Sequence, residues 1–140
     1  MSFFGIVPRV SMFVLPYALL ALYLNFRFRV WFGLPVLGYI MLFLGLVLWL
    51  VCYSQVSKAY RERKLLTTGC YSRVRHPIYS IWGFLVIPGF SFIIGGFMLG
   101  LPVVYWLFML KFIGDEEREL EEMFGEEWRK YARRTGRFLP

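Results

Sequence analysis

The residues best suited to chemistry form two short polar clusters on either side of one long uncharged run. Residues 75–79 read Arg-His-Pro-Ile-Tyr and contain the only histidine of the chain, and residues 115–117 read Asp-Glu-Glu. The run between them, 77–110, includes no Asp, Glu, Lys or Arg and no histidine. Ionisable groups beside such a run are costly in a membrane unless they have a function. We therefore expect the two clusters to bracket a cofactor pocket.

The elements that must position these clusters are membrane helices. Of the 140 residues, 59% are hydrophobic, which is too apolar for a soluble domain of this size. The apolar residues are concentrated in three uncharged runs, 10–26, 30–57 and 77–110. Because a helix needs about 20 apolar residues to cross the bilayer core, these runs predict one multi-pass membrane domain. Pro16 and the lack of a small-residue cleavage site indicate that the first run is a retained span rather than a signal peptide.

The net charge of +7 comes from two basic clusters beside the apolar runs and does not indicate a nucleic-acid partner. Six of the sixteen basic residues lie in 58–75, and five lie in 129–137. The positive-inside rule places both clusters in the cytoplasm, where they also attract anionic membrane lipids. We therefore expect both termini to be cytoplasmic. The sequence offers no argument for an oligomeric state.

We expect an all-α integral membrane protein with about four membrane helices. The first two are full spans, and the third run forms a helical hairpin whose limbs have about 14 to 18 residues, short for a full span. Its turn comes from the Pro-Gly pair at 88–89 and the Gly-Gly pair at 95–96, either as one loop or as a break and a turn. Gly38 and Gly45, which lie on one helix face, predict close packing against another helix.

From Asp115 onward the chain changes character. Eight of the nine acidic residues lie in 115–127, and the residues that follow are basic. Apolar residues recur there at helical spacing and predict a cytoplasmic amphipathic helix, with a bend or a close approach at Gly125. The single domain thus divides into an N-terminal hairpin (1–57), a basic loop (58–76), a helical hairpin (77–112) and a C-terminal cofactor-closing helix (113–140).

The two cysteines offer no argument for a disulfide framework. Cys52 lies inside the second apolar run, whereas Cys70 lies in the basic loop. With a single histidine in the chain there is also no cluster of metal ligands, so we expect no metal site.

Two motifs occur in a fixed order along the second half of the chain. Residues 66–79 read Leu-Thr-Thr-Gly-Cys-Tyr-Ser-Arg-Val-Arg-His-Pro-Ile-Tyr, and Glu-Glu at 116–117 is followed by Phe-Gly-x-x-Trp-x-x-Tyr at 124–131. This pair resembles the isoprenylcysteine carboxyl methyltransferase family and its relatives, the phospholipid N-methyltransferases. Those are integral membrane enzymes that use S-adenosylmethionine. The resemblance covers 66–140, and it departs from the family at Cys70, where relatives usually have proline.

The resemblance implies roles for ten residues. The implied cofactor-binding residues are Tyr71, His76, Pro77, Tyr79, Glu116, Glu117 and Tyr131. The implied catalytic residues, which would orient an anionic acceptor or the carboxylate of the cofactor, are Arg75, Arg134 and Arg137. The two glutamates would reach the ammonium group or ribose hydroxyls of S-adenosylmethionine, and Tyr131 would close the site.

The shortage of candidate bases favours a carboxylate as the methyl acceptor. Methyl transfer from a sulfonium requires mainly that the nucleophile and the methyl group be held in line. A carboxylate is already ionised at neutral pH, whereas an amine or thiol would need a base, and His76 is the only side chain with an ordinary pKa near neutrality. The predicted function is therefore an S-adenosylmethionine-dependent methyltransferase for a lipophilic acceptor such as an isoprenylcysteine-like α-carboxyl.

Other interpretations remain open. His76 before a proline could cap a helix, the acidic pair could complement a helix dipole, and the arginines could be lipid anchors. Among functions, the alternatives are an NADPH-dependent membrane reductase of the sterol-reductase type, a phospholipid N-methyltransferase and a non-enzymatic scaffold. Ile78 and Ser80 count against the reductase, whose motif would have asparagine and an acidic residue there.

Overall fold

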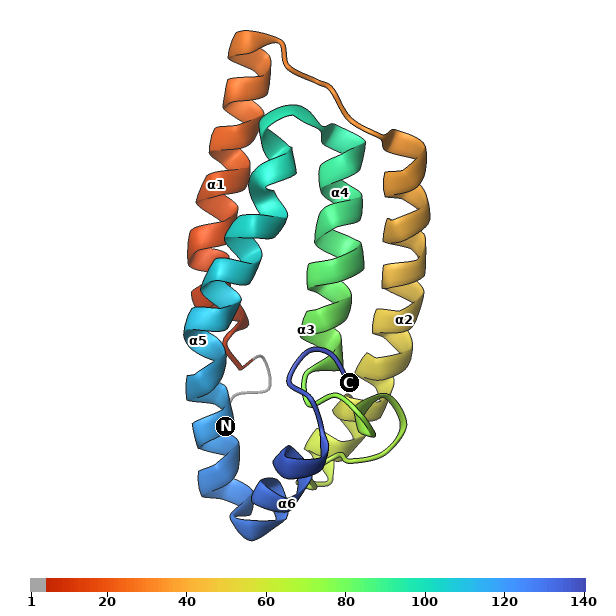
Figure 1. The fold of residues 1–140 in the computed structure, drawn as a ribbon, viewed down its shortest axis with the longest axis vertical. Coiled ribbons are helices and arrows are strands. Elements are labelled where there is room, and N and C mark those ends of the chain that lie inside the picture. Colours follow the sequence, from red (N-terminus) through yellow and green to blue (C-terminus); the bar gives the residue numbers. More distant parts are fainter. Residues whose placement is uncertain (1–4) are drawn as a thin grey trace.

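The computed structural model describes residues 5–140 as a bundle of helices (Figure 1). Four helical segments are long and apolar enough to cross a membrane, namely α1 (Val7–Phe28), α2 (Pro35–Arg61), Pro77–Ile94 and Gly96–Phe124. Within residues 5–140 the only β pairing is an isolated bridge between Val74 and Gly136. The predicted all-α, multi-pass membrane architecture is confirmed.

The third membrane segment is one helix with a wider turn in its middle. It consists of α3 (Pro77–Ile81), the π-helical segment η2 (Trp82–Val86) and α4 (Ile87–Ile94). The chain then reverses at Gly95 and Gly96, whose φ angles of 74° and 60° lie in the left-handed region that favours glycine. The return limb begins with the 3₁₀ segment η3 (Gly96–Gly100) and continues as α5 (Leu101–Phe124).

The Pro-Gly pair at 88–89 lies inside α4 and makes no turn, so that part of the turn prediction is wrong. Pro88 is the second residue of α4, just past η2, and a local π-helical turn is one way in which a membrane helix accommodates proline. Gly89 instead permits a close contact between α4 and α2. A Cβ atom at Gly89 would lie 2.8 Å from the carbonyl oxygen of Gly38 on α2.

The second limb of the hairpin is longer than the predicted limbs. The first limb has 18 residues, but the second has 29, because α5 continues past the last apolar residues into the acidic segment. The first strong interruption is Gly125, with a φ of 58°, which separates α5 from α6 (Glu126–Arg134). The bend predicted at Gly125 is therefore present.

The four long segments pack as two pairs, α1 with α5 and α2 with α4 (Figure 1). The close approach of α2 to the third segment depends on the predicted glycines: a Cβ at Gly38 would lie 2.5 Å from the Gly89 oxygen, and one at Gly45 would lie 2.7 Å from Val86 Cγ2. Buried Asn25 ties α1 to the hairpin turn, donating to the Gly95 carbonyl at 3.0 Å. These contacts leave α1 and α2 on opposite sides of the space near the motif loop.

Candidate functional site

The loop that carries the Arg-His-Pro motif is joined to the C-terminal tail by backbone hydrogen bonds. The N–H of Arg75 donates to the Gly136 carbonyl at 2.8 Å, and the N–H of His76 donates to the Arg137 carbonyl at 3.1 Å. The N–H of Gly136 in turn donates to the Arg73 carbonyl at 3.0 Å. Two segments that are far apart in the sequence thus form one unit at the end of the bundle where the C-terminus lies (Figure 1).

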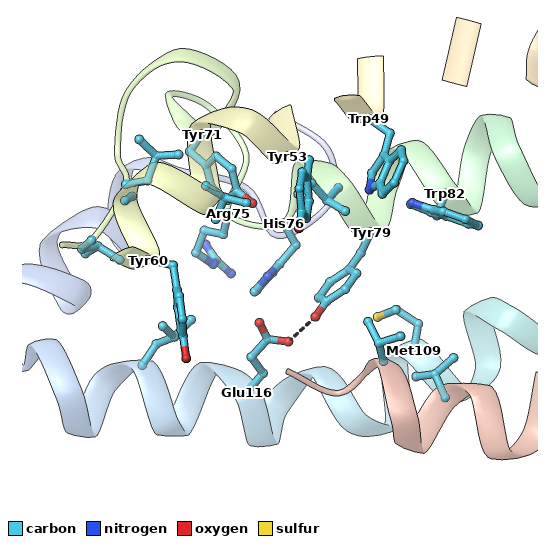
Figure 2. Close-up of a pocket in the computed structure, with 18 of the residues that line it drawn as sticks. Trp49, Tyr53, Tyr60, Tyr71, Arg75, His76, Tyr79, Trp82, Met109 and Glu116 are labelled. Atoms are coloured by element: carbon cyan, nitrogen blue, oxygen red, sulfur yellow. Dashed lines mark hydrogen bonds between the residues drawn. The ribbon is translucent and has the colours of Figure 1, made fainter. Parts of the chain in front are cut away.

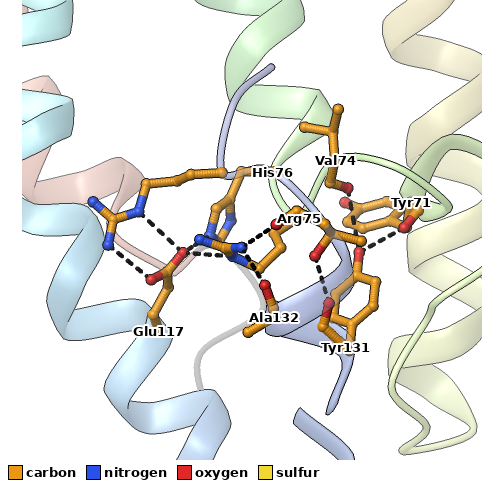
Figure 3. Close-up of polar contacts among 9 residues, drawn as sticks. Tyr71, Val74, Arg75, His76, Glu117, Tyr131 and Ala132 are labelled. Atoms are coloured by element: carbon orange, nitrogen blue, oxygen red, sulfur yellow. Dashed lines mark hydrogen bonds and ion pairs between the residues drawn. The ribbon is translucent and has the colours of Figure 1, made fainter. Parts of the chain in front are cut away.

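Glu117 on α5 connects this unit to the helices (Figure 3). Its Oε1 accepts from Arg75 Nε at 3.1 Å, His76 Nε2 at 2.9 Å and Arg137 Nε at 3.2 Å, and its Oε2 accepts from Arg137 at 2.9 Å. Since an ionised carboxylate can only accept, we assign the proton to Nε2 of His76. With 16% of its side chain exposed, Glu117 is surrounded by partners and acts as a clamp between the two motifs.

Glu116, the next residue, leaves the helix in another direction and enters a pocket (Figure 2). Its Oε2 accepts from the Tyr79 hydroxyl at 2.8 Å, and the backbone of Ile6 also hydrogen-bonds this carboxylate. Consecutive helical residues point about 100° apart, which explains why two neighbouring glutamates serve different surroundings. Glu116 therefore lines the pocket, whereas Glu117 connects the motif loop and the C-terminal tail to α5.

The pocket has a volume of about 530 Å³, within the range of small-molecule sites. Its polar end is formed by the motif residues and Glu116, and its other end is apolar (Figure 2). α1 and α2 line opposite sides, for example Val10 and Val14 on one side and Trp49 and Tyr53 on the other. The arrangement can hold a polar group at one end and an apolar chain at the other.

Two tyrosines close the polar end, of which Tyr131 is buried and Tyr71 partly buried. The hydroxyl of Tyr131, on α6, donates to the carbonyl oxygens of Tyr71 at 2.7 Å and Val74 at 3.2 Å. Burial raises the pKa of Tyr131 to about 12 and that of Tyr71 well above its usual value, so both phenols stay neutral donors at physiological pH. Tyr131 thus fixes α6 onto the motif loop.

Six of the ten residues implied by the resemblance line the pocket: Tyr71, Arg75, His76, Tyr79, Glu116 and Tyr131. The other four lie outside that lining. Pro77 is buried at the start of α3, Glu117 and Arg137 pair with each other, and exposed Arg134 lies with its guanidinium carbon 5.8 Å from the centre of the Tyr131 ring.

Several lining residues have no counterpart in the sequence motifs. They are Trp49, Tyr53 and Tyr60 on α2, Lys64 and Leu65 after it, and Trp82, Tyr105 and Met109 on the hairpin. The α2 aromatic residues recur at spacings of four and seven, so a helical face was visible in the sequence. Nothing in that pattern separates a pocket wall from a lipid-facing stripe.

Cys52 and Cys70 form a disulfide, a pairing for which the sequence pattern offered no argument. After α2 the chain reverses through Arg63, whose φ is 54°, and returns along the same helix. The two Cα atoms are 5.7 Å apart, within the usual range for a disulfide. The N–H of Cys70 also donates to Gln55 Oε1 at 3.0 Å, so the loop is attached to α2 immediately before Tyr71.

Comparisons with known proteins point to one family. The chain is 31% identical over 86 residues to "Protein-S-isoprenylcysteine O-methyltransferase" of Schizosaccharomyces pombe, a match covering 60% of this chain and 36% of the relative. It is 33% identical over 93 residues to "Protein-S-isoprenylcysteine O-methyltransferase B" of Arabidopsis thaliana, covering 63% and 46%. A "Probable protein-S-isoprenylcysteine O-methyltransferase" of Oryza sativa subsp. indica is 35% identical over 82 residues, covering 56% and 42%.

The matched region spans less than half the length of each of these relatives. No protein-family model matches the chain, and no solved structure matches it significantly. The similarity of the chain to the protein-S-isoprenylcysteine O-methyltransferases confirms the family resemblance predicted from its two motifs.

Proposed function

We propose that the protein is an S-adenosylmethionine-dependent methyltransferase that esterifies the carboxylate of a lipophilic acceptor of the isoprenylcysteine type. The observation that carries this proposal is a single pocket with a charged, tyrosine-rich end and an apolar end between membrane helices. The relatives named above are O-methyltransferases by name, which agrees with this chemistry.

The polar end suits a cationic methyl donor. When bound, S-adenosylmethionine supplies a methyl group on a positively charged sulfonium. The carboxylate of Glu116 offers it an opposite charge, and the rings of Tyr71 and Tyr79 offer aromatic faces that attract cations. His76 and Pro77 shape this end through the backbone of the motif, and Glu117 keeps His76 oriented. These residues fit the cofactor.

Arg75 is the only one of the three arginines that lines the pocket, so we propose that it orients an acceptor carboxylate, while its Nε and Nη1 atoms hold Glu117 and the carbonyls of Ala132 and Thr135. Arg137 is paired with Glu117, and we propose that it acts by holding this clamp. Arg134 lies beside Tyr131 and outside the pocket lining. Because the acceptor is already ionised, no side chain needs to remove a proton. The protein aligns the two reactants and excludes water.

We also propose that the site faces the cytoplasm, with both termini on that side. The four candidate spans bring the chain back to the side on which it began, and the loop 62–76 and α6 carry most of the basic residues there. Fusion of a reporter that is active only in the cytoplasm to the C-terminus should give signal. Signal only from a reporter that requires export would contradict this orientation.

The direct test is methyl transfer from labelled S-adenosylmethionine to a synthetic isoprenylcysteine by the detergent-purified protein. We expect base-labile methyl ester to form, and we expect at least a tenfold loss of rate in Glu116→Gln, as for the loss of a charge that contacts the reacting group. Glu126→Gln is the matched control, since Glu126 pairs with Arg129 and Arg133 on the exposed face of α6.

Two other outcomes would reject the proposed acceptor. Base-stable methylation of phosphatidylethanolamine alone would indicate a phospholipid N-methyltransferase. Binding of NADPH without binding of S-adenosylhomocysteine would indicate a reductase.

A further inference from the structure

The polar end of the pocket is in contact with the start of the chain, far from both motifs in the sequence. Gly5 and Ile6 form the turn before α1, and this turn lies against Glu116 and Tyr79 (Figure 2). A Cβ atom at Gly5 would lie 2.8 Å from Glu116 Oε2 and 2.8 Å from the Tyr79 hydroxyl oxygen. A larger residue would therefore displace one of these two oxygens. The φ of Gly5, 55°, also lies in the left-handed region that favours glycine.

Ile6 attaches the turn to the same carboxylate. Its backbone hydrogen-bonds Glu116, and because an ionised carboxylate only accepts, the donor is the Ile6 N–H. The side chain of Ile6 is 3% exposed and belongs to the buried cluster that includes Met109 and Ile113 of α5. The turn is thus held against α5 through both its backbone and its side chain.

Further contacts join the beginning of α1 to α5 around this point. Arg9, in the first turn of α1, donates from Nη1 to Oδ2 of Asp115 at 2.8 Å. This pair is half-exposed and contributes little stability by itself, but it connects α1 to the residue directly before Glu116. One turn further on, Phe13 stacks on Phe108 with ring centroids 4.1 Å apart. The turn before α1 is therefore a fixed neighbour of the Glu116 side chain.

Glu116 keeps the capacity to bind a ligand while these contacts are made. A carboxylate offers about four lone-pair sites, and the Tyr79 hydroxyl and the Ile6 N–H occupy two of them. The two donors come from different elements, α3 and the turn before α1, and together they fix the direction of the remaining sites. An ammonium group in the pocket can donate to those sites.

We propose that the Gly5–Ile6 turn positions the Glu116 carboxylate for the cofactor, so that a segment outside both motifs determines how tightly the cofactor binds. The inference rests on the proposed function for the identity of the cofactor, and on the contacts of the turn for the positioning. Gly5 and Ile6 act through Glu116 and are positioning residues.

The test is a calorimetric titration with S-adenosylhomocysteine of the parent, Gly5→Ala, Glu116→Gln and the double variant. We expect Gly5→Ala to weaken binding roughly tenfold, as for a lost hydrogen bond to a charged group. If Gly5 acts through Glu116, the double variant binds no more weakly than Glu116→Gln alone. Parent-like affinity in folded Gly5→Ala, or effects of the two substitutions that simply add, would overturn the inference.

Gly125→Ala is the matched control for backbone strain. The φ of Gly125 is 58°, close to that of Gly5, but nothing lies within 4 Å of a Cβ there. We expect its affinity to stay within twofold of the parent, and equal weakening in both glycine variants would contradict the positioning. In turnover assays of Gly5→Ala, the KM for S-adenosylmethionine should rise while the KM for the prenylcysteine stays within twofold. An equal rise in both would also contradict it.

Hydrogen–deuterium exchange tests the attachment without a ligand and without a change at Gly5. We expect the Ile6 N–H to exchange faster in Glu116→Ala, which has no side-chain acceptor, and as in the parent in Glu126→Gln. If the parent binds no S-adenosylhomocysteine, the proposed function fails. Faster exchange in Glu116→Ala would then still show that the turn positions this carboxylate, and unchanged exchange would reject it.

Discussion

The adjacent glutamates on α5, Glu116 and Glu117, have different surroundings. Glu116 faces the pocket and is bound by the Tyr79 hydroxyl, whereas Glu117 is surrounded by Arg75, His76 and Arg137. A partly buried carboxylate with three cationic or potentially cationic partners contributes mainly through the cost of leaving those partners unpaired. The resemblance implies a cofactor contact for both residues, but in the structure only Glu116 lines the pocket.

The two glutamates should therefore respond differently to the same substitution. Glu117→Gln removes the charge that joins both motifs, and we expect a loss of about 3 kcal/mol in the free energy of unfolding. Glu116→Gln leaves that network intact and should change the melting temperature little. Thermal unfolding of the two purified variants in one detergent measures the difference. Equal melting temperatures would contradict the division.

At the scale of helices, the site depends on how closely α2 approaches the third membrane segment. Gly38 and Gly45 permit that approach, and the disulfide fixes the loop after α2 against the same helix. Neither the two glycines nor the two cysteines line the pocket, so both features act through the positions of the helices and the loop. The sequence predicts the glycine contact but not the disulfide. The seven-residue spacing of the two glycines indicates helix packing, whereas the return of the loop to Cys52 depends on the reversal of the chain at Arg63.

Enlarging the packing glycine should separate the helices. A methyl group at Gly38 would meet backbone atoms of the third segment, so Gly38→Ala should lower the free energy of unfolding by about 1–3 kcal/mol. Gly114→Ala is the matched control, because nothing lies within 4 Å of a Cβ there. In a helix that control should be neutral or stabilising by about 1 kcal/mol. The account of this interface would be wrong if both variants melted alike.

Reducing the disulfide should loosen the motif loop. A bond that closes a loop of this length contributes about 3 kcal/mol by restricting the unfolded chain. We expect Cys52→Ser and reduction with dithiothreitol to lower the melting temperature by the same amount, and reduction to have no further effect on the variant. Non-reducing peptide mapping of the parent should recover the Cys52–Cys70 pair, and two free thiols in unreduced protein would contradict it.

For the molecule as a whole, four candidate spans bring the C-terminal tail and both motifs to one end of the bundle, with the pocket extending from there between α1 and α2. The membrane class, the even number of passes and the bend at Gly125 could all be predicted, because each depends on local composition. The motif pair also predicted most of the polar end.

Other features depend on tertiary contacts that a sequence pattern does not contain. From the sequence Pro88 could be placed in a turn or a helix, and in the structure it lies in a helix just past a π-helical segment. Trp49 on α2 looks the same in sequence whether it faces lipid or the pocket. The roles of Glu116 and Glu117 depend on which neighbours the C-terminal tail supplies.

The most direct test of the central claim is a calorimetric titration of the detergent-purified protein with S-adenosylhomocysteine, beside Glu116→Gln and Glu126→Gln. We predict binding by the parent, at least tenfold weaker binding by Glu116→Gln because a charge contact in the pocket is lost, and unchanged binding by Glu126→Gln. A folded parent that does not bind S-adenosylhomocysteine, or a Glu116→Gln variant that binds it as tightly as the parent does, would contradict the account.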